Sequence, residues 1–83
     1  MSIRTLVADD HPIFRDGLVK SLEETGEFRV VAVASSASEA MKLADQKRPD
    51  IALLDLSMPG NGLTAVSEIS AAGTAGQIAM LTV

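Results

Sequence analysis

The feature that most constrains the fold is the regular recurrence of four short apolar runs along the chain. These runs occupy residues 6–8, 30–34, 51–54 and 78–81, and each intervening segment is long enough to hold a helix. Alternation of this kind is typical of an α/β protein with a parallel sheet, because parallel strands need a crossover connection. The sequence therefore predicts a βαβαβαβ chain.

The character of the runs predicts where each strand lies in the sheet. Three of the four are continuously apolar, as expected for parallel strands that are buried on both faces. The exception begins at Phe28 and carries the charged residue Arg29, which suits an edge strand. We therefore expect a doubly wound, flavodoxin-like sheet in which the strand order is 2-1-3-4.

The three connecting segments each predict a helix. In the first, apolar residues recur every fourth position, at Phe14, Leu18 and Leu22, which predicts one buried stripe. The second opens with Ser36 and Glu39 in capping-box spacing. The third, residues 62–73, keeps an apolar spacing of three but is rich in weak helix formers. Phe14 and Met41 are interpreted as core residues.

Composition excludes several classes of function. At 83 residues there is room for one small domain, and the net charge of −4 with scattered basic residues argues against nucleic-acid binding by this segment. The absence of cysteine excludes disulfides and thiolate metal sites. The apolar runs are too short to span a bilayer, and the start lacks a signal-peptide pattern, so we expect a cytoplasmic protein.

Acidic residues follow two of the strands. Asp9 and Asp10 come directly after the first apolar run, and Asp55 follows the third. In the predicted strand order these strands are neighbours, so their carboxyl ends meet in one crevice. A hard divalent cation with oxygen ligands would neutralise three carboxylates there, and Mg²⁺ fits because it needs few protein ligands. Asp55 stands alone and is the candidate nucleophile towards phosphorus.

A simpler interpretation remains open for the acidic pair. Aspartates in strand-to-helix loops often serve only to cap the next helix, which could explain either Asp9 or Asp10 alone. His11 follows the pair and precedes Pro12. We interpret it as a solvent-facing loop residue and leave it out of the predicted site.

Three segments of the chain carry a resemblance to a known family. Residues 9–18 read DDHPIFRDGL, residues 55–60 read DLSMPG, and the chain continues to Leu81 and Thr82. These segments resemble the receiver domain of bacterial two-component response regulators related to nitrate- and quorum-responsive transcription factors (LuxR-like, FixJ/NarL-type). The resemblance spans the whole chain. It implies the flavodoxin-like (CheY-like) fold and phosphoryl transfer from a sensor histidine kinase, in a protein that regulates transcription.

The resemblance also implies a role for each matching residue. Asp55 would be the phosphoacceptor and a metal ligand, and Asp10 a direct Mg²⁺ ligand. Asp9 would act mostly through water, and Ser57 would offer its backbone carbonyl to the metal. Thr82 would be the switch hydroxyl that turns towards the phosphoryl group. Taken alone, however, Thr82 is also an ordinary β-branched strand residue.

Two departures from the family pattern affect these expectations. The loop at residues 58–63 is one residue shorter than the common form, which predicts a tighter entry to the third helix. The family domain has five strands and five helices, so we expect residues 1–83 to be an incomplete receiver domain, truncated after strand 4. The fifth-strand lysine and the DNA-binding output domain would be absent. The open edge of the fourth strand would then favour a homodimer.

Two alternative functions remain. A pseudo-receiver would keep the fold and act as a dimerisation or interaction module without phosphorylation. Residues 60–65 also fit the dinucleotide-binding fingerprint, although residues 55–59 separate it from the preceding strand. Enzymatic turnover is not expected beyond slow self-dephosphorylation, because no further acid or base is placed for rapid hydrolysis of an acyl phosphate.

Overall fold

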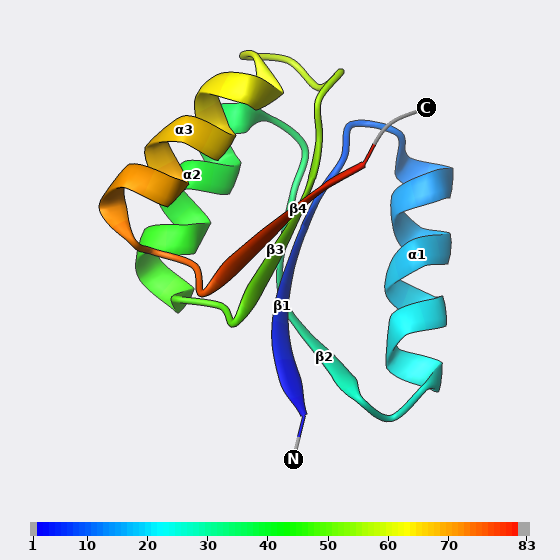
Figure 1. Ribbon diagram of the computed structural model, residues 1–83. Helices are drawn as coiled ribbons and strands as arrows, with labels where there is room; N and C mark the ends of the chain where they lie inside the picture. The colour runs from blue at the N-terminus through cyan, green and yellow to red at the C-terminus, as the bar shows by residue number, and fades with distance from the viewer. Residues whose placement is uncertain (1, 82–83) are drawn as a thin grey trace.

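The protein folds as a four-stranded parallel sheet with helices on both faces (Figure 1). The computed structural model describes residues 2–81. The elements follow in the order β1 (Ile3–Ala8), α1 (Pro12–Glu24), β2 (Phe28–Ala34), α2 (Ala37–Lys47), β3 (Ile51–Asp55), α3 (Gly62–Ala72) and β4 (Gln77–Leu81). The strand order is β2-β1-β3-β4, which confirms the predicted sheet and the edge position of β2.

The helices divide unequally between the two faces of the sheet. Figure 1 shows α2 and α3 together on one side and α1 on the other. The core lies mainly under the α2–α3 pair, where Leu6, Leu54 and Ile69 are the largest buried apolar side chains. Helix α2 turns an apolar face to this core, because its alanines at 37, 40 and 44 are fully buried.

The predicted burial of the apolar stripe of α1 is too deep. Over its whole described length α1 contributes no fully buried residue, and Phe14 is 55% exposed rather than part of the core. Among the described elements, α1 packs chiefly against β2 and β1 and has no helix beside it. A single helix on one face leaves its flanks open to solvent. Met41, the other predicted core residue, is partly buried and packs against the core from α2.

The helix ends explain why the weaker helix predictions succeed. Ser36 caps α2 by accepting a hydrogen bond from the Glu39 amide at 3.2 Å. Asn61 caps α3, its side-chain oxygen accepting from the Leu63 amide at 3.0 Å. Helix α3 then buries Ala65 and Ile69 against the core, so tertiary packing offsets its poor intrinsic propensity.

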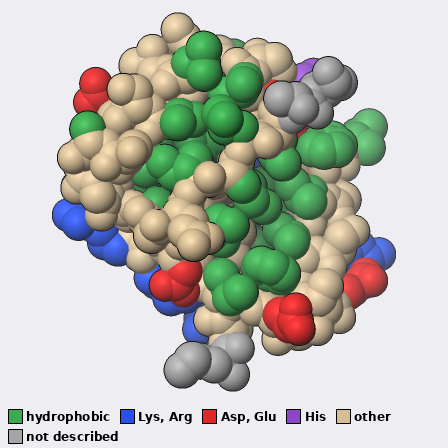
Figure 2. Space-filling model, viewed as in Figure 1, with side chains coloured by type: hydrophobic (Ala, Val, Ile, Leu, Met, Phe, Trp, Pro, Cys, Tyr) green, Lys and Arg blue, Asp and Glu red, His purple; other side chains and the backbone are tan. Residues whose placement is uncertain are grey.

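The outer edge of β4 is open among the described residues. Strand β4 pairs with β3 on one side only, and Met80 on β4 is more than half exposed. Figure 2 shows hydrophobic side chains gathered along the middle of this face, between α3 and α1. In the part of the chain that is described, no helix is long and apolar enough to cross a membrane.

Candidate metal centre

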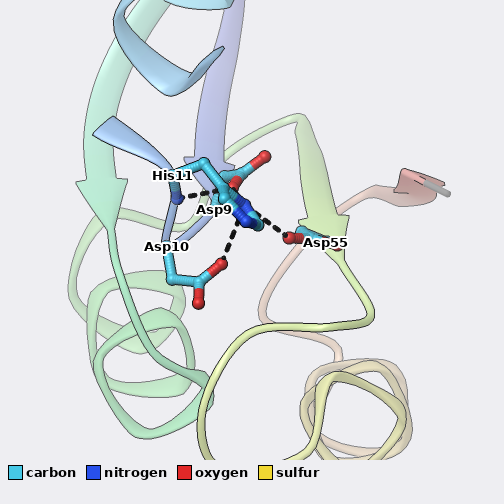
Figure 3. Close-up of side chains that lie close together, drawn as sticks. All are labelled: Asp9, Asp10, His11 and Asp55. Atoms are coloured by element: carbon cyan, nitrogen blue, oxygen red, sulfur yellow. Dashed lines mark hydrogen bonds and ion pairs between the residues drawn. The ribbon is translucent and has the colours of Figure 1, made fainter. Parts of the chain in front are cut away.

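The two acidic segments meet at the carboxyl ends of β1 and β3. These strands are parallel neighbours, and Ala8 pairs in register with Leu54, so the residues that follow each strand emerge side by side. Ligand atoms of Asp9, Asp10, His11 and Asp55 all lie within 4.8 Å of one another (Figure 3). The predicted clustering of the three carboxylates is therefore confirmed, while the role of each carboxylate stays a prediction.

The three carboxylates differ in exposure. Asp9 and Asp55 are each 2% exposed, whereas the Asp10 side chain is 30% exposed. Even so, Asp10 Oδ1 is buried and accepts no hydrogen bond from residues 2–81, although the His11 Nδ1 lies 3.1 Å from it. A buried carboxylate oxygen is costly unless a donor or cation completes it. The oxygen-rich donor set therefore fits Mg²⁺.

The alternative that the acidic pair caps the next helix is wrong. The N-cap of α1 is His11, and this described helix start has no side-chain cap hydrogen bond. Asp9 instead accepts from the His11 backbone amide, with 2.8 Å between Oδ1 and the nitrogen. Pro12 occupies the first helical turn, where its missing N–H costs nothing. The helix starts without using either aspartate as a cap, so both carboxylates face the crevice.

The ring of His11 lies among the carboxylates, which the sequence analysis did not foresee. Its Nδ1 is 3.0 Å from Asp9 Oδ1, 3.1 Å from Asp10 Oδ1 and 3.8 Å from Asp55 Oδ2 (Figure 3). The side chain is 60% exposed, so the expected solvent exposure is right. The exclusion of His11 from the cluster is corrected by these distances. The only signal in the sequence was its position directly after the acidic pair.

The acidic surroundings raise the pKa of His11 above its usual value of 6.5. The largest cause is the side-chain hydrogen bond to Asp9, followed by the charge of Asp10. When the imidazole is protonated, it supplies part of the positive charge that three carboxylates require. This stabilising contribution is complete below the unfolded-state pKa near 6.5 and is lost as the pH rises through the higher folded-state pKa.

Ser57 holds the carboxylate of Asp55 in a fixed orientation. The Ser57 backbone amide donates to Asp55 Oδ1 at 3.0 Å, and its hydroxyl lies 2.9 Å from both carboxylate oxygens. The resemblance implied that the Ser57 carbonyl binds the metal, and that role stays a prediction. The contacts that orient Asp55 come instead from the amide and the hydroxyl. Thr82, the predicted switch residue, lies outside the described residues.

The loop from β3 to α3 is tight, as its short length predicts. A Cβ built on Gly62 would lie 2.6 Å from the Leu56 Cα and 2.7 Å from the Asp55 carbonyl oxygen. Gly60 has a φ of +89° and packs against Ala37. These contacts give both glycines a structural reason that is unrelated to phosphate binding. The dinucleotide interpretation of residues 60–65 therefore loses its basis.

The family model for the response regulator receiver domain matches residues 5–83. The chain belongs to this family. This receiver domain combines the 2-1-3-4 sheet with an aspartate cluster at the carboxyl ends of β1 and β3. This match confirms the resemblance that residues 9–18 and 55–60 carry.

Similar proteins place the receiver more narrowly. It is 45% identical over 58 residues to a probable transcriptional regulatory protein NarL of Mycobacterium tuberculosis, covering 70% of this chain and 27% of that protein. It is 39% identical to a nitrate/nitrite response regulator homologue of Haemophilus influenzae, covering 98% of this chain and 39% of that protein. The receiver thus spans well under half the length of these relatives.

Solved structures agree with the fold. The signal receiver domain of the putative response regulator NarL from Mycobacterium tuberculosis superposes with a TM-score of 0.90 at 32% identity, covering 98% of this chain and 66% of that one. A LuxR-family response regulator from Aurantimonas gives a TM-score of 0.87 at 36% identity, covering 99% of this chain and 59% of that one. The protein is a receiver domain of the NarL/LuxR type.

Proposed function

We propose that this receiver accepts a phosphoryl group on Asp55 with Mg²⁺ held beside it. The observation that carries the proposal is the convergence of three carboxylates, two of them almost fully buried, where β1 and β3 end. Asp10, whose buried Oδ1 accepts no hydrogen bond from residues 2–81, is the direct metal ligand. Asp9 acts mostly through water, and Asp55 and the Ser57 carbonyl complete the set.

The hydrogen bonds of Asp55 favour one of its two oxygens as the attacking atom. Oδ1 is held by both the amide and the hydroxyl of Ser57, whereas Oδ2 accepts a hydrogen bond from the hydroxyl alone and lies 3.8 Å from the His11 Nδ1. Oδ2 is therefore the freer oxygen and attacks phosphorus, forming an acyl phosphate while the bond from phosphorus to the donor's leaving atom breaks. The bound cation spreads the negative charge that develops on the transferred group. Ser57 keeps the carboxylate aligned during the approach.

The wider role follows from the relatives. Their names describe transcriptional and nitrate/nitrite response regulators, and each is much longer than this receiver. We propose that a sensor histidine kinase supplies the phosphoryl group, that residues 1–83 form an incomplete receiver domain, and that transcription is regulated through a separate DNA-binding domain. Cytoplasmic location and slow self-dephosphorylation belong to the same proposal, and Thr82 is its switch hydroxyl.

Phosphorylation is tested directly by intact-mass spectrometry. The wild-type protein, incubated with Mg²⁺ and acetyl phosphate, is expected to gain one phosphoryl group, and Asp55→Asn is expected to gain none. The amide of the variant has the size of the carboxylate but lacks its nucleophilic oxygen. Asp50→Asn is a matched control at an exposed aspartate outside the cluster and should be phosphorylated normally. An unmodified wild type would favour an interaction module instead.

Dimerisation through the β4 edge is a separate proposal for a protein of these 83 residues. Its support is the one-sided pairing of β4 and the exposure of Met80. Edge strands with unpaired backbone groups pair readily with another chain, and a lysine on the edge opposes this. Sedimentation equilibrium is expected to show a dimer that Met80→Lys shifts towards monomer. A wild type that is monomeric at high micromolar concentration would contradict the proposal.

A further inference from the structure

The imidazole of His11 is a side chain of the acidic crevice that phosphoryl transfer does not require. We propose that His11 is a nitrogen ligand of this site, so that the receiver binds first-row transition ions such as Co²⁺ and Ni²⁺ in preference to Mg²⁺. The inference rests on the metal site of the proposed function and adds the class of ion that the site selects. The observation that supports it is the position of the His11 Nδ1 between three carboxylates (Figure 3).

The distances fit a shared coordination sphere. Donor atoms bound at about 2.0–2.1 Å from one ion lie roughly 2.8–3.0 Å from their neighbours in octahedral geometry and roughly 3.3–3.4 Å in tetrahedral geometry. Nδ1 is 3.0 and 3.1 Å from oxygens of Asp9 and Asp10, and 3.8 Å from an oxygen of Asp55. For an ion to bind at the centre of this group, Nδ1 must release to solvent the proton that it shares with the Asp9 carboxylate, and the imidazole then binds as a neutral ligand. The Asp10 oxygen in this set is Oδ1, which is buried and accepts no hydrogen bond from residues 2–81.

The backbone holds the imidazole in reach of the site. The His11 amide donates to the same Asp9 oxygen that its ring approaches, with distances of 2.8 Å for the amide and 3.0 Å for the ring. Pro12 follows in the first turn of α1 and restricts the backbone there. The ring itself is 60% exposed and free to tilt. His11 can therefore approach an ion, or withdraw from it, without disturbing the core.

The nitrogen ligand changes which ions the site prefers. Mg²⁺ favours oxygen ligands and retains water, so it gains little from an imidazole. Imidazole suits first-row transition ions, and the affinity of a mixed nitrogen and oxygen site for them rises from Mn²⁺ through Co²⁺ and Ni²⁺ to Cu²⁺ and falls at Zn²⁺. The chain contains one histidine and no cysteine, so His11 is its sole imidazole and no thiolate competes. Selectivity between these ions and Mg²⁺ therefore depends on one side chain.

Equilibrium binding separates the two classes of ion. Protein without a histidine tag is titrated with Ni²⁺ or Mg²⁺, and wild type is compared with His11→Ala. Loss of the imidazole is expected to weaken Ni²⁺ binding at least about tenfold, because losing even a group that only supports a metal ligand typically costs about that much. The same substitution is expected to leave Mg²⁺ binding within about twofold of wild type. Asp10→Asn serves as the positive control and should weaken both ions. Equal changes for both ions in His11→Ala would overturn the proposal.

Co²⁺ provides a second readout that does not depend on a variant. Because the chain has a single histidine, one strongly shifted, solvent-exchangeable ring N–H resonance in the Co²⁺ NMR spectrum would identify ligation by His11. Absence of that signal from a Co²⁺-saturated protein would overturn the inference. The proposed function fails on a different result, since it requires mass gain at Asp55 with Mg²⁺. Each proposal can therefore fail while the other stands.

Discussion

Gly62→Ala is expected to lower the free energy of unfolding by about 3 kcal/mol, because the added methyl group overlaps backbone atoms. The new Cβ would lie 2.6 Å from the Leu56 Cα and 2.7 Å from the carbonyl oxygen of Asp55. Neither neighbour is the flexible end of a side chain, so the β3–α3 loop must shift. That loop contains Ser57, whose amide and hydroxyl orient Asp55, so phosphoryl uptake should fall as well.

A matched substitution separates this overlap from the general effect of replacing glycine. Gly17 lies within α1, and among the described atoms nothing stands within 4 Å of the Cβ position. Gly17→Ala is therefore expected to stabilise the protein by roughly 0.5–1 kcal/mol, since alanine loses less backbone entropy in a helix. Urea unfolding of the two variants measures both effects. Equal stabilities for Gly62→Ala and wild type would contradict the close approach of the loop to α3.

Leu54→Ala is the second substitution with a large expected effect, lowering the free energy of unfolding by about 3 kcal/mol. Leu54 lies in β3 directly before Asp55 and is fully buried in the main core. Removing its side chain leaves a cavity beneath the strand that presents the phosphoacceptor. A small domain has limited stability, so thermal unfolding followed by circular dichroism should show a greatly lowered midpoint.

The same chemical change at an exposed position provides the control. Leu63 lies in the first turn of α3 and is 60% exposed. Leu63→Ala is expected to change the free energy of unfolding by less than about 1 kcal/mol, because little apolar surface is returned to water. If both leucines proved equally costly, the assignment of the main core to the side of α2 and α3 would be wrong.

Local pattern and propensity account for most of the secondary structure. The apolar runs predicted every strand, and the capping pair at Ser36 and Glu39 predicted the start of α2. Periodicity failed at Phe14, whose exposure depends on what lies beside α1 rather than on its spacing. A repeat of apolar residues shows which face of a helix turns inward. How deeply that face is buried depends on the neighbouring elements.

The candidate site divides in the same way. The clustering of Asp9, Asp10 and Asp55 was predictable, because β1 and β3 are parallel neighbours in the predicted strand order and their carboxyl ends lie at the same edge of the sheet. The hydroxyl and amide contacts of Ser57 with Asp55 were not, because they depend on how the loop turns. The position of the His11 ring depends in turn on side-chain torsion angles that no spacing in the sequence specifies.

By itself, then, the sequence determined the parallel sheet in its 2-1-3-4 order and the three acids of the crevice, because these follow from hydrophobic pattern and strand direction. The family followed from the motifs at residues 9–18 and 55–60. Only the tertiary structure decided the contacts within the crevice. It showed which Asp55 oxygen accepts the hydrogen bond of the Ser57 amide and which buried Asp10 oxygen accepts no hydrogen bond from residues 2–81. It also showed that the His11 ring faces the acids. The reason is physical. The hydrophobic pattern acts over whole helices and strands. Coordination instead depends on the positions of individual atoms to within a few tenths of an ångström.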